Sequence, residues 1–395
     1  MSEAVTTSFD PIMATYSRFP VTIIKGKGSY VWDEDGDRYL DYTSGIATCN
    51  LGHVPDTVQA ALHEQIDELW HCSNLFHIPK QIELATLLTQ NSFADQVFFC
   101  NSGAEANEAA IKLARRFTHM TKNKNTGDIV TFTQSFHGRT LATLTATAQE
   151  KIQEGFAPLV PGFRYLPFNS MEALDAITAE NTNAVLLELV QGEGGVIPAD
   201  EKWVEALYQI CQAEGILFMV DEIQTGLGRT GMLFAYQHYG IEPDIMTLAK
   251  GLGSGFPIGA VLAKGHISQA FSPGAHGSTF GGNPLASAAG VATIKTLLKS
   301  RVIEKGAENG HYLKTKLKAL QQKYPDDIHE VRGKGLLLGL VTEQKASDIV
   351  YLALKQHVLI LTAGPHVVRI LPPLTTTKEE IDHFITILDS VFESL

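Results

Sequence analysis

Short apolar runs rich in β-branched residues recur through the middle of this chain, and helical stretches separate them. Such runs are typical of strands buried on both faces of a sheet, and their alternation with helices is typical of parallel strands. The pattern therefore predicts a mostly parallel sheet with helices on both faces. The expected strands are Val97–Cys100, Ile129–Thr133, Ala184–Leu189, Ile216–Val220, Ile245–Leu248 and Ala260–Ala263, and the clearest helix is Ala104–Phe117.

Both ends of the chain have a different character. Residues 20–45 combine glycine-rich turns with short alternating strands, and the chain after about Gly290 contains long helices, a glycine-punctuated strand over Gly333–Val341 and a closing helix from Lys378. The 395-residue length is that of roughly two or three domains. We expect an N-terminal segment (residues 1–47) packed with a small C-terminal α+β domain (residues 290–395), and a large domain formed by residues 48–289.

The composition excludes several classes of protein. Hydrophobic residues make up 44% and charged residues 19% of the chain, a balance typical of globular and not of disordered proteins. Lys and Arg (31) are outnumbered by Asp and Glu (43), and the net charge of −12 argues against nucleic-acid binding. Residues Met1–Asp10 are polar and lack the basic start and apolar stretch of a signal peptide, and no apolar run approaches the ~18 residues of a membrane helix, so we expect no membrane contact. The four cysteines form neither a CxxC pair nor a zinc pattern, which predicts a cytoplasmic protein without a metal site.

Lys250 is the most informative single residue. It follows the expected strand Ile245–Leu248, enters a glycine-rich turn and is the only charged residue between Ile245 and Ala263. Such a lysine is either a surface side chain whose stem lies along apolar neighbours or a functional amine. In the second case burial would lower the pKa of the amine and favour covalent chemistry with a carbonyl group.

Two further positions lie where the carboxyl ends of parallel strands meet the ligand crevice of an open sheet. Asp221 follows Ile216–Val220, and its carboxylate would either hold a protonated ring nitrogen or face solvent. The turn Asn101–Ala104 joins a strand to a helix, so its backbone N–H groups would either bind a phosphate or begin an ordinary helix. Gly226–Gly231 matches the GxGxxG pattern, but it does not follow a strand directly, so a dinucleotide site is not expected.

Two loops supply the remaining candidates. Phe136 follows an expected strand, where its ring would be able to stack on a planar cofactor, and the nearby Arg139 has the shape to grip a carboxylate with two hydrogen bonds. His137, between them, is expected to be structural. Ser278 and Thr279 lie in a glycine-rich loop, either as phosphate contacts or as members of an ordinary turn.

Together these motifs resemble the class III (ornithine-type) aminotransferases, which have the pyridoxal phosphate (PLP) type I fold. The resemblance covers nearly the whole chain, and within the family it is strongest to the branch that acts on acetylornithine. The matching stretches are Asn101–Asn107 (NSGAEAN), Ser135–Thr140 (SFHGRT), Gln191–Gly195 (QGEGG), Asp221–Gly226 (DEIQTG), Thr247–Gly251 (TLAKG) and His276–Pro284 (HGSTFGGNP).

The resemblance implies an aminotransferase with PLP as its cofactor. Lys250 would carry the cofactor covalently and move a proton between substrate and cofactor, while Asp221 would keep the ring nitrogen protonated. Gln224 would bond the phenolic oxygen, and Phe136 would stack on the ring. The phosphate would be held by Ser102, Gly103 and Ala104 and, from the other subunit of a homodimer with active sites at the interface, by Thr279.

The resemblance also implies how an amino donor and a 2-oxo acid are recognised. Arg139 would bind the α-carboxylate of N-acetylornithine and the distal carboxylate of glutamate, and Arg369 the α-carboxylate of glutamate or 2-oxoglutarate, with Ser278 near the substrate. Glu193 would pair with Arg369 while a terminal amine is bound and move away for a dicarboxylate. The reaction would convert N-acetylornithine and 2-oxoglutarate to N-acetylglutamate 5-semialdehyde and glutamate, a step of arginine biosynthesis.

Other activities remain open at this point. Relatives of the same family act on ornithine, succinyl-diaminopimelate or 4-aminobutyrate, and a scaffold protein of the same fold without catalysis is a more remote alternative. Ornithine transaminases usually have a tyrosine in the region of Thr43–Ala47, where this chain has none, which disfavours ornithine. The stretches Ala249–Gly259 and Gly281–Pro284 favour acetylornithine.

Overall fold

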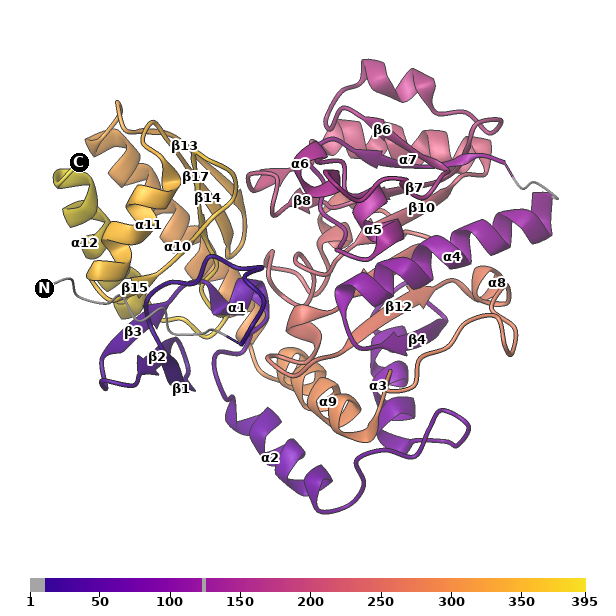
Figure 1. Cartoon of the computed structure of the whole chain (residues 1–395), viewed down its shortest axis with the longest axis horizontal. Helices are drawn as coiled ribbons and strands as arrows, with labels where there is room; N and C mark the ends of the chain where they lie inside the picture. The colour runs from indigo at the N-terminus through magenta and orange to yellow at the C-terminus, as the bar shows by residue number, and fades with distance from the viewer. Residues whose placement is uncertain (1–10, 123–125) are drawn as a thin grey trace, which may run out of the picture.

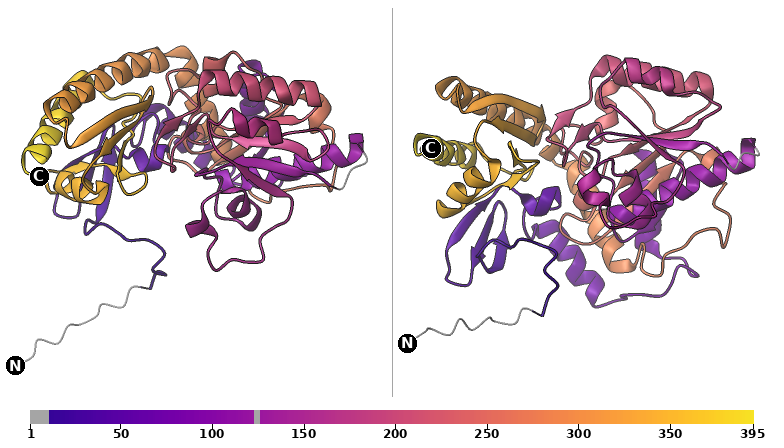
Figure 2. Two further views of the ribbon diagram at one scale, coloured as in Figure 1. Left: turned by 90° about the horizontal axis from the view of Figure 1, so that it is seen from above. Right: turned by 45° about the horizontal axis from the view of Figure 1, so that its top comes forward.

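The structure is a computed structural model that describes residues 11–122 and 126–395. Figure 1 shows two parts side by side: a large part around a central sheet, and a smaller part in which the indigo N-terminal strands lie beside the yellow C-terminal elements. The views in Figure 2 show the same division. Residues 1–10 of the predicted N-terminal segment (1–47) lie outside the described residues.

The central sheet positions the candidate site. Its order is β4 (Gln96–Cys100), β12 (Gly259–Ala263), β11 (Ile245–Leu248), β10 (Leu217–Asp221), β7 (Thr182–Leu187), β5 (Asp128–Phe132) and β6 (Phe163–Leu166). Neighbouring strands are parallel except where β12 runs antiparallel to β11 and β4. All strands but β12 therefore share one direction, and their carboxyl ends lie along one edge. This confirms the expected α/β class, and β6 is a strand that the sequence pattern did not indicate.

Each face of the central sheet has its own core because successive strand residues point to opposite sides. Leu186 packs in a cluster with α4 (Gly103–Lys122), whereas its neighbour Leu187 packs in a cluster with α7 (Glu201–Glu214). The central strands are buried on both faces, so they appear in the sequence as continuous apolar runs and not as an alternating pattern.

Helices also flank the sheet below the strands in Figure 1, where α9 (Pro284–Lys299) packs against α2 (Asp56–Ile66) and α3 (Pro79–Gln90).

The predicted domain boundaries remain predictions, and the second of them, between residues 289 and 290, falls inside α9. Within the part of the chain that the structure describes, none of the helices combines the length and the apolar stretch needed to cross a membrane. Shorter helices are α5 (Leu141–Ala146), α6 (Glu150–Gln153) and α8 (Gly265–Ser268), with 3-10 turns η1 (Glu172–Ala176), η2 (Ala235–Tyr239) and η3 (Lys250–Leu252).

The small part is built from both ends of the chain. β3 (Arg38–Asp41) pairs in parallel with β15 (Val358–Leu359), and this pairing joins the N-terminal strands to the C-terminal region. That sheet also contains β1 (Ile23–Lys27) and β2 (Tyr30–Asp33). A second sheet, in the order β13 (Ile328–Lys334), β14 (Leu337–Thr342), β17 (Val367–Ile370) and β16 (Leu361–Thr362), accompanies α10 (Val302–Lys323), α11 (Ala346–Lys355) and α12 (Lys378–Glu393).

One sequence expectation in this part is wrong. The single strand expected over Gly333–Val341 is a hairpin, in which β13 and β14 pair in antiparallel fashion. Gly335 turns the chain between them with a φ of 58°, and a Cβ atom there would lie 2.4 Å from the carbonyl carbon of Thr230. Only glycine combines this left-handed conformation with so close an approach of two backbones.

Candidate active site

A cavity of about 450 Å³ lies at the carboxyl ends of the parallel strands, and we call it the central cavity. Residues far apart in the sequence meet there because each follows a different strand of one sheet. Of the residues predicted from the sequence, those that line it are Ser102, Gly103, Ala104, Phe136, Arg139, Asp221, Gln224 and Lys250.

Lys250 begins the turn η3 directly after β11, where it lines the central cavity. Its φ of 42° lies in the left-handed region, which costs energy for a residue with a side chain and is typical of functional sites. Burial lowers the pKa of its amine below the ordinary value for lysine; the charge of Glu193 opposes this shift, and the charge of Arg369 adds to it. The structure thus favours the functional amine over a surface lysine.

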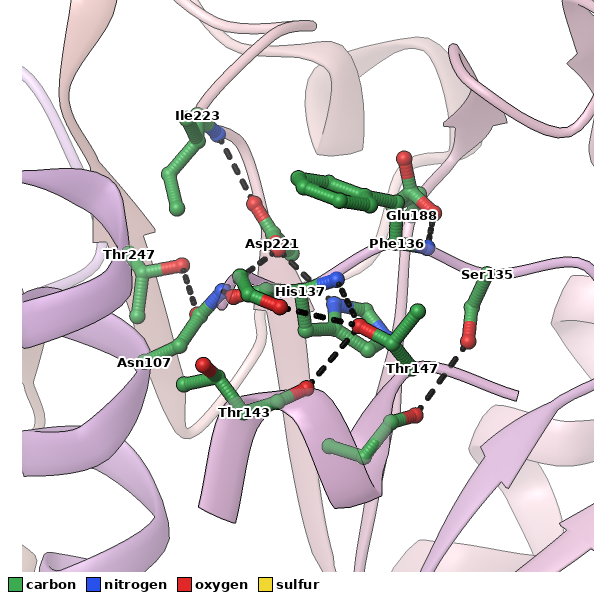
Figure 3. A network of polar contacts seen from close by, with 12 residues as sticks. Asn107, Ser135, Phe136, His137, Thr143, Thr147, Glu188, Asp221, Ile223 and Thr247 are labelled. Carbon is green, nitrogen blue, oxygen red and sulfur yellow. Dashed lines mark hydrogen bonds and ion pairs between the residues drawn. The ribbon is translucent and has the colours of Figure 1, made fainter. Parts of the chain in front are cut away.

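Asp221 ends β10 and lies at the centre of the polar network in Figure 3. Its Oδ2 accepts hydrogen bonds from Asn107 Nδ2 at 2.7 Å and from His137 Nδ1 at 2.8 Å, and its Oδ1 accepts one from the N–H of Ile223 at 3.0 Å. Asn107 is itself fixed by Thr247, whose hydroxyl donates to Asn107 Oδ1 at 2.8 Å. A buried carboxylate with this many donors is held in one position.

His137 has a more specific place than the structural one expected from the sequence. Its N–H backbone group donates to Thr147 Oγ1 at 2.9 Å, and Asn107 Nδ2 donates to its carbonyl oxygen at 2.8 Å. Its Nδ1 must carry a proton, because it faces the carboxylate of Asp221, while its buried Nε2 has no hydrogen-bond partner within the described residues. His137 itself lines the central cavity, and its imidazole orients Asp221 there.

The turn before α4 forms one wall of the central cavity. The first N–H groups of a helix have no partner inside the helix, so they and the helix dipole favour an anion at this end. Gly103, the first residue of α4, is tightly packed: a Cβ atom there would lie 2.8 Å from Ile223 Cδ1. Ser102 Oγ accepts a hydrogen bond from the N–H of Glu105 at 3.2 Å, which fixes the start of the helix.

Glu193 and Arg369 form an ion pair beside the central cavity. The Nη2 of Arg369 lies 3.2 Å from Oε2 of Glu193, and Gln224 joins the pair by accepting from Arg369 Nη1 at 3.3 Å. Burial alone would raise the pKa of Glu193, but the charge of Arg369 and its hydrogen bonds hold that pKa below the ordinary value. Arg369 lies in β17 of the small part, so this pair connects the two parts of the molecule at the site.

The other predicted substrate contacts lie at the rim. Arg139 is exposed, with its guanidinium carbon 5.6 Å from the centre of the Phe136 ring. Ser278 Oγ accepts a hydrogen bond at 3.2 Å from Asn101, a residue of the cavity wall, whereas Thr279 is exposed and does not line the central cavity of its own chain.

Glu188 is a wall residue that the sequence analysis missed. It follows β7 at the same sheet edge as Asp221, and its carboxylate accepts hydrogen bonds from the N–H groups of Phe136 at 2.9 Å and Gly192 at 3.3 Å. Burial raises the pKa of Glu188 to about 7, with the nearby His137 opposing that shift. Glu188 lies inside the expected strand Ala184–Leu189, near its carboxyl end, and a carboxylate at that end of an apolar run was the signal that would have found it.

The comparisons with known proteins agree with this geometry. Residues 12–392 match the family described as "Aminotransferase class-III". The "Acetylornithine aminotransferase" of Oceanobacillus iheyensis is 58% identical over 96% of this chain and 95% of its own length. Among solved structures, N-acetylornithine aminotransferase from Stenotrophomonas maltophilia is 36% identical with a TM-score of 0.84, covering 96% of this chain and 97% of that one. Ornithine aminotransferase from Toxoplasma gondii, in a structure described as having partial occupancy of PLP at the active site, is 31% identical with a TM-score of 0.92, covering 97% of this chain and 92% of that one.

Proposed function

This chain belongs to the class-III aminotransferases, and on that basis we propose that it transfers the terminal amino group of N-acetylornithine to 2-oxoglutarate. The products are N-acetylglutamate 5-semialdehyde and glutamate, as in arginine biosynthesis. The observation that carries the proposal is that Lys250, Asp221 and the turn Ser102–Ala104 line one cavity. The substrate is supported by the name of the relative that is 58% identical over nearly the full length of both chains.

We propose PLP as the cofactor because the residues of the central cavity match its chemistry. The buried carboxylate of Asp221 suits a protonated ring nitrogen, the backbone N–H groups at the start of α4 suit a phosphate, and Lys250 supplies the amine that an aldehyde requires. Gln224 and Phe136 line the same cavity and would hold the phenolic oxygen and the ring face. When bound, PLP supplies an electron sink for the charge left when a proton leaves the substrate carbon.

Two residues of the chain supply the proton acceptor and the fixed charge that this reaction needs. Burial lowers the pKa of Lys250 and so favours the neutral amine, the form that accepts and holds the proton of the substrate carbon. Asp221, fixed by His137 and Asn107, supplies a negative charge that needs no rearrangement during the reaction.

Two arginines serve the two substrates in this proposal. Arg139 at the rim binds the α-carboxylate of N-acetylornithine, and Ser278 lies near the substrate through its contact with the cavity wall. Glu193 neutralises Arg369 while this donor is bound, and the ion pair between the two side chains supports this role. When 2-oxoglutarate enters, its α-carboxylate takes the place of Glu193 on Arg369, and Arg139 holds its distal carboxylate.

We further propose a homodimer with the active sites at its interface, located in the cytoplasm. Trp70 is 63%, Phe76 is 68% and Phe280 is 59% exposed, and the two segments lie together because Asn74 Nδ2 donates to the carbonyl oxygen of Gly281 at 2.9 Å. An exposed apolar surface of this kind favours burial against another protein. A second copy seated there would bring the exposed Thr279 towards the partner's phosphate site. The four cysteines are free, as expected in a reducing compartment.

A donor panel tests the substrate. The purified enzyme is supplied with 2-oxoglutarate and with N-acetylornithine, ornithine, succinyl-diaminopimelate or 4-aminobutyrate, and glutamate formation is followed. We expect the highest kcat/KM for N-acetylornithine, and a higher value for any other donor would assign the enzyme to that donor. Borohydride reduction followed by peptide mass mapping tests the cofactor separately. The mass of the reduced cofactor should be found on the peptide that contains Lys250.

A further inference from the structure

The glycine-rich segment Gly226–Gly231, which follows Asp221 and the end of β10, lies against the small part of the molecule. A Cβ atom on Gly228 would lie 2.7 Å from Leu374 Cδ1, so only a residue without a side chain permits this approach. The carbonyl oxygen of Arg229 accepts a hydrogen bond at 2.9 Å from the N–H of Leu336, in the turn between β13 and β14. The segment is therefore a contact surface between the large and the small part.

The side chain of Arg229 is buried in this contact surface although it carries a charge. It is 0% exposed, and burial lowers its pKa to about 10, which leaves it protonated at neutral pH. Its partners among the described residues are neutral oxygens. Nη1 donates to the carbonyl oxygens of Leu336 at 3.1 Å and of Pro372, Nη2 donates to Asn50 Oδ1 at 2.9 Å, and Nε has no partner there. A buried cation without an anion is costly for a fold, so these bonds indicate a role in placing the groups that they join.

Asn50 connects Arg229 to the turn that contains the functional amine. Its Oδ1 accepts from Arg229, and its Nδ2 donates to the carbonyl oxygen of Leu227 at 2.9 Å, so both ends of the amide are fixed. The amide packs closely on Gly251, where a Cβ atom would lie 2.7 Å from Asn50 Cγ. Gly251 directly follows Lys250. The amide that Arg229 holds therefore lies against the backbone next to Lys250.

Pro372 connects Arg229 to the strand that carries Arg369. This strand, β17, ends two residues before Pro372. The residue between them, Leu371, is buried, and its N–H donates to the carbonyl oxygen of Tyr42 at 2.7 Å. Because this short stretch is held at Leu371 and again at Pro372, a shift of Pro372 would change the place of the Arg369 guanidinium beside the central cavity.

We propose that Arg229 is a positioning residue that sets Arg369 relative to Lys250 and serves the half-reaction of the 2-oxo acid. The inference rests on the proposed function, in which Arg369 binds a substrate carboxylate only in that half-reaction and pairs with Glu193 in the other. N-acetylornithine is held instead by Arg139, in a loop of the large part. Two hydrogen bonds from one guanidinium to a carboxylate require accurate placement. Loss of the bonds made by Arg229 therefore weakens the reaction of 2-oxoglutarate and spares that of N-acetylornithine.

Two variants of Arg229 test the proposal in the full-length enzyme with its cofactor. Arg229→Met keeps a long side chain but removes all three hydrogen bonds, whereas Arg229→Lys keeps the charge but lacks the planar fork. Steady-state kinetics give kcat/KM for each substrate, and each value reports the half-reaction of that substrate alone. We expect Arg229→Met to lower kcat/KM for 2-oxoglutarate about tenfold or more and to leave that for N-acetylornithine within about twofold. Arg229→Lys should have a smaller effect in the same direction.

The ratio of the two kcat/KM values separates positioning from stability. A fraction of inactive protein lowers both values equally and leaves their ratio unchanged. Asn309→Ala is the matched control, because Asn309 Nδ2 donates to the carbonyl oxygen of Thr376 at 2.6 Å, a hydrogen bond inside the small part. This variant should lower the midpoint of thermal unfolding and keep the ratio within about twofold of the wild-type value.

Two results overturn the proposal. The first is a folded Arg229→Met whose ratio is unchanged or shifted in favour of 2-oxoglutarate, and the second is failure of both Arg229 variants to fold, which would make the residue purely structural. This inference and the proposed function fail differently. A wild-type enzyme that forms no glutamate from N-acetylornithine and 2-oxoglutarate contradicts the proposed function, whereas an active wild type with an unchanged ratio in the variants contradicts only the role of Arg229.

Discussion

The bond between His137 and Asp221 offers the sharpest test of how the site is organised. His137 is 2% and Asp221 4% exposed, so water cannot replace a lost donor easily. His137→Phe keeps a flat ring in the buried site but removes the donor. His137→Asn removes the ring but has an amide nitrogen at the position where Nδ1 stands in the histidine. The pair of variants therefore separates the hydrogen bond from the packing.

The expected effect follows from the network around Asp221. In the Phe variant Oδ2 keeps one side-chain donor, Asn107 Nδ2 at 2.7 Å, and loses the other. A hydrogen bond to a charged group contributes about 1.5–3 kcal/mol, and about 1.4 kcal/mol corresponds to a tenfold change in rate. If the carboxylate acts on the reacting system as proposed, His137→Phe should lower kcat about 10- to 150-fold, and His137→Asn should lower it less than about tenfold.

The assay is kcat with N-acetylornithine and 2-oxoglutarate at saturation, together with thermal unfolding of each variant. Thr145→Val is the control: the Thr145 hydroxyl, in the nearby helix α5, donates to the carbonyl oxygen of Leu141 at 2.8 Å and accepts from the N–H of Val160 at 3.1 Å, without a contact to Asp221. It should lose stability but keep kcat within about twofold, because each of these neutral hydrogen bonds away from the site contributes about 1 kcal/mol to folding only. A folded His137→Phe with wild-type kcat, or two His137 variants that are equally impaired, would refute the reasoning.

The remaining predictions concern the substrates, stability and assembly. Arg139→Ala should raise the KM of both N-acetylornithine and 2-oxoglutarate by about tenfold or more in steady-state kinetics, and an unchanged KM for both would contradict the carboxylate assignment. Glu193→Gln should raise the KM of N-acetylornithine about tenfold while leaving that of 2-oxoglutarate unchanged or lower, because it removes the partner of Arg369 in one half-reaction only. The hydrogen bond of His53 to Asp41 raises the pKa of its ring to about 10 in the folded protein against 6.5 for an ordinary histidine, so the stabilisation by this pair is complete below pH 6.5 and is lost as the pH rises through 10. Urea unfolding at pH 6.5 and 9.5 should differ by about 2 kcal/mol more in wild type than in His53→Gln, a linkage value reduced for partial exposure of the ring; equal differences would show that the pair contributes nothing. Phe280→Glu should shift the enzyme from dimer to monomer in sedimentation, with loss of cofactor-dependent activity, and an active dimer would place the interface elsewhere.

The central sheet was predictable because its signal is local. Each expected strand is a continuous apolar run, and the rule that ligands bind at the carboxyl ends of parallel strands then places Asp221 and Lys250 together. In the structure β10 and β11 are neighbours, with Asp221 opposite Thr247, three residues before Lys250. Asp221 and Lys250 are therefore close in space although they are far apart in the sequence, because both lie at the same edge of the sheet.

The parts that were missed depend on contacts between distant segments. The role of His137 is set by Asp221, 84 residues away, and that of Glu188 by an N–H group 52 residues away. Neither partner is visible in a local pattern, and a histidine in a polar loop has many possible roles. The hairpin at Gly335 was missed for the same reason, because the need for glycine there arises from the backbone of Thr230.

The charges around Lys250 explain how one lysine can serve two different half-reactions. Burial is the main cause of its lowered pKa; the charge of Arg369 adds to that shift and the charge of Glu193 opposes it. If Glu193 moved away from Arg369 with nothing in its place, that balance would be lost. In the proposed reaction it moves only when a carboxylate of the dicarboxylate substrate takes over the pairing, and one negative charge replaces another. In the proposed cycle the exchange of carboxylates on Arg369 would select the substrate and would keep a negative charge near the amine of Lys250 in both half-reactions.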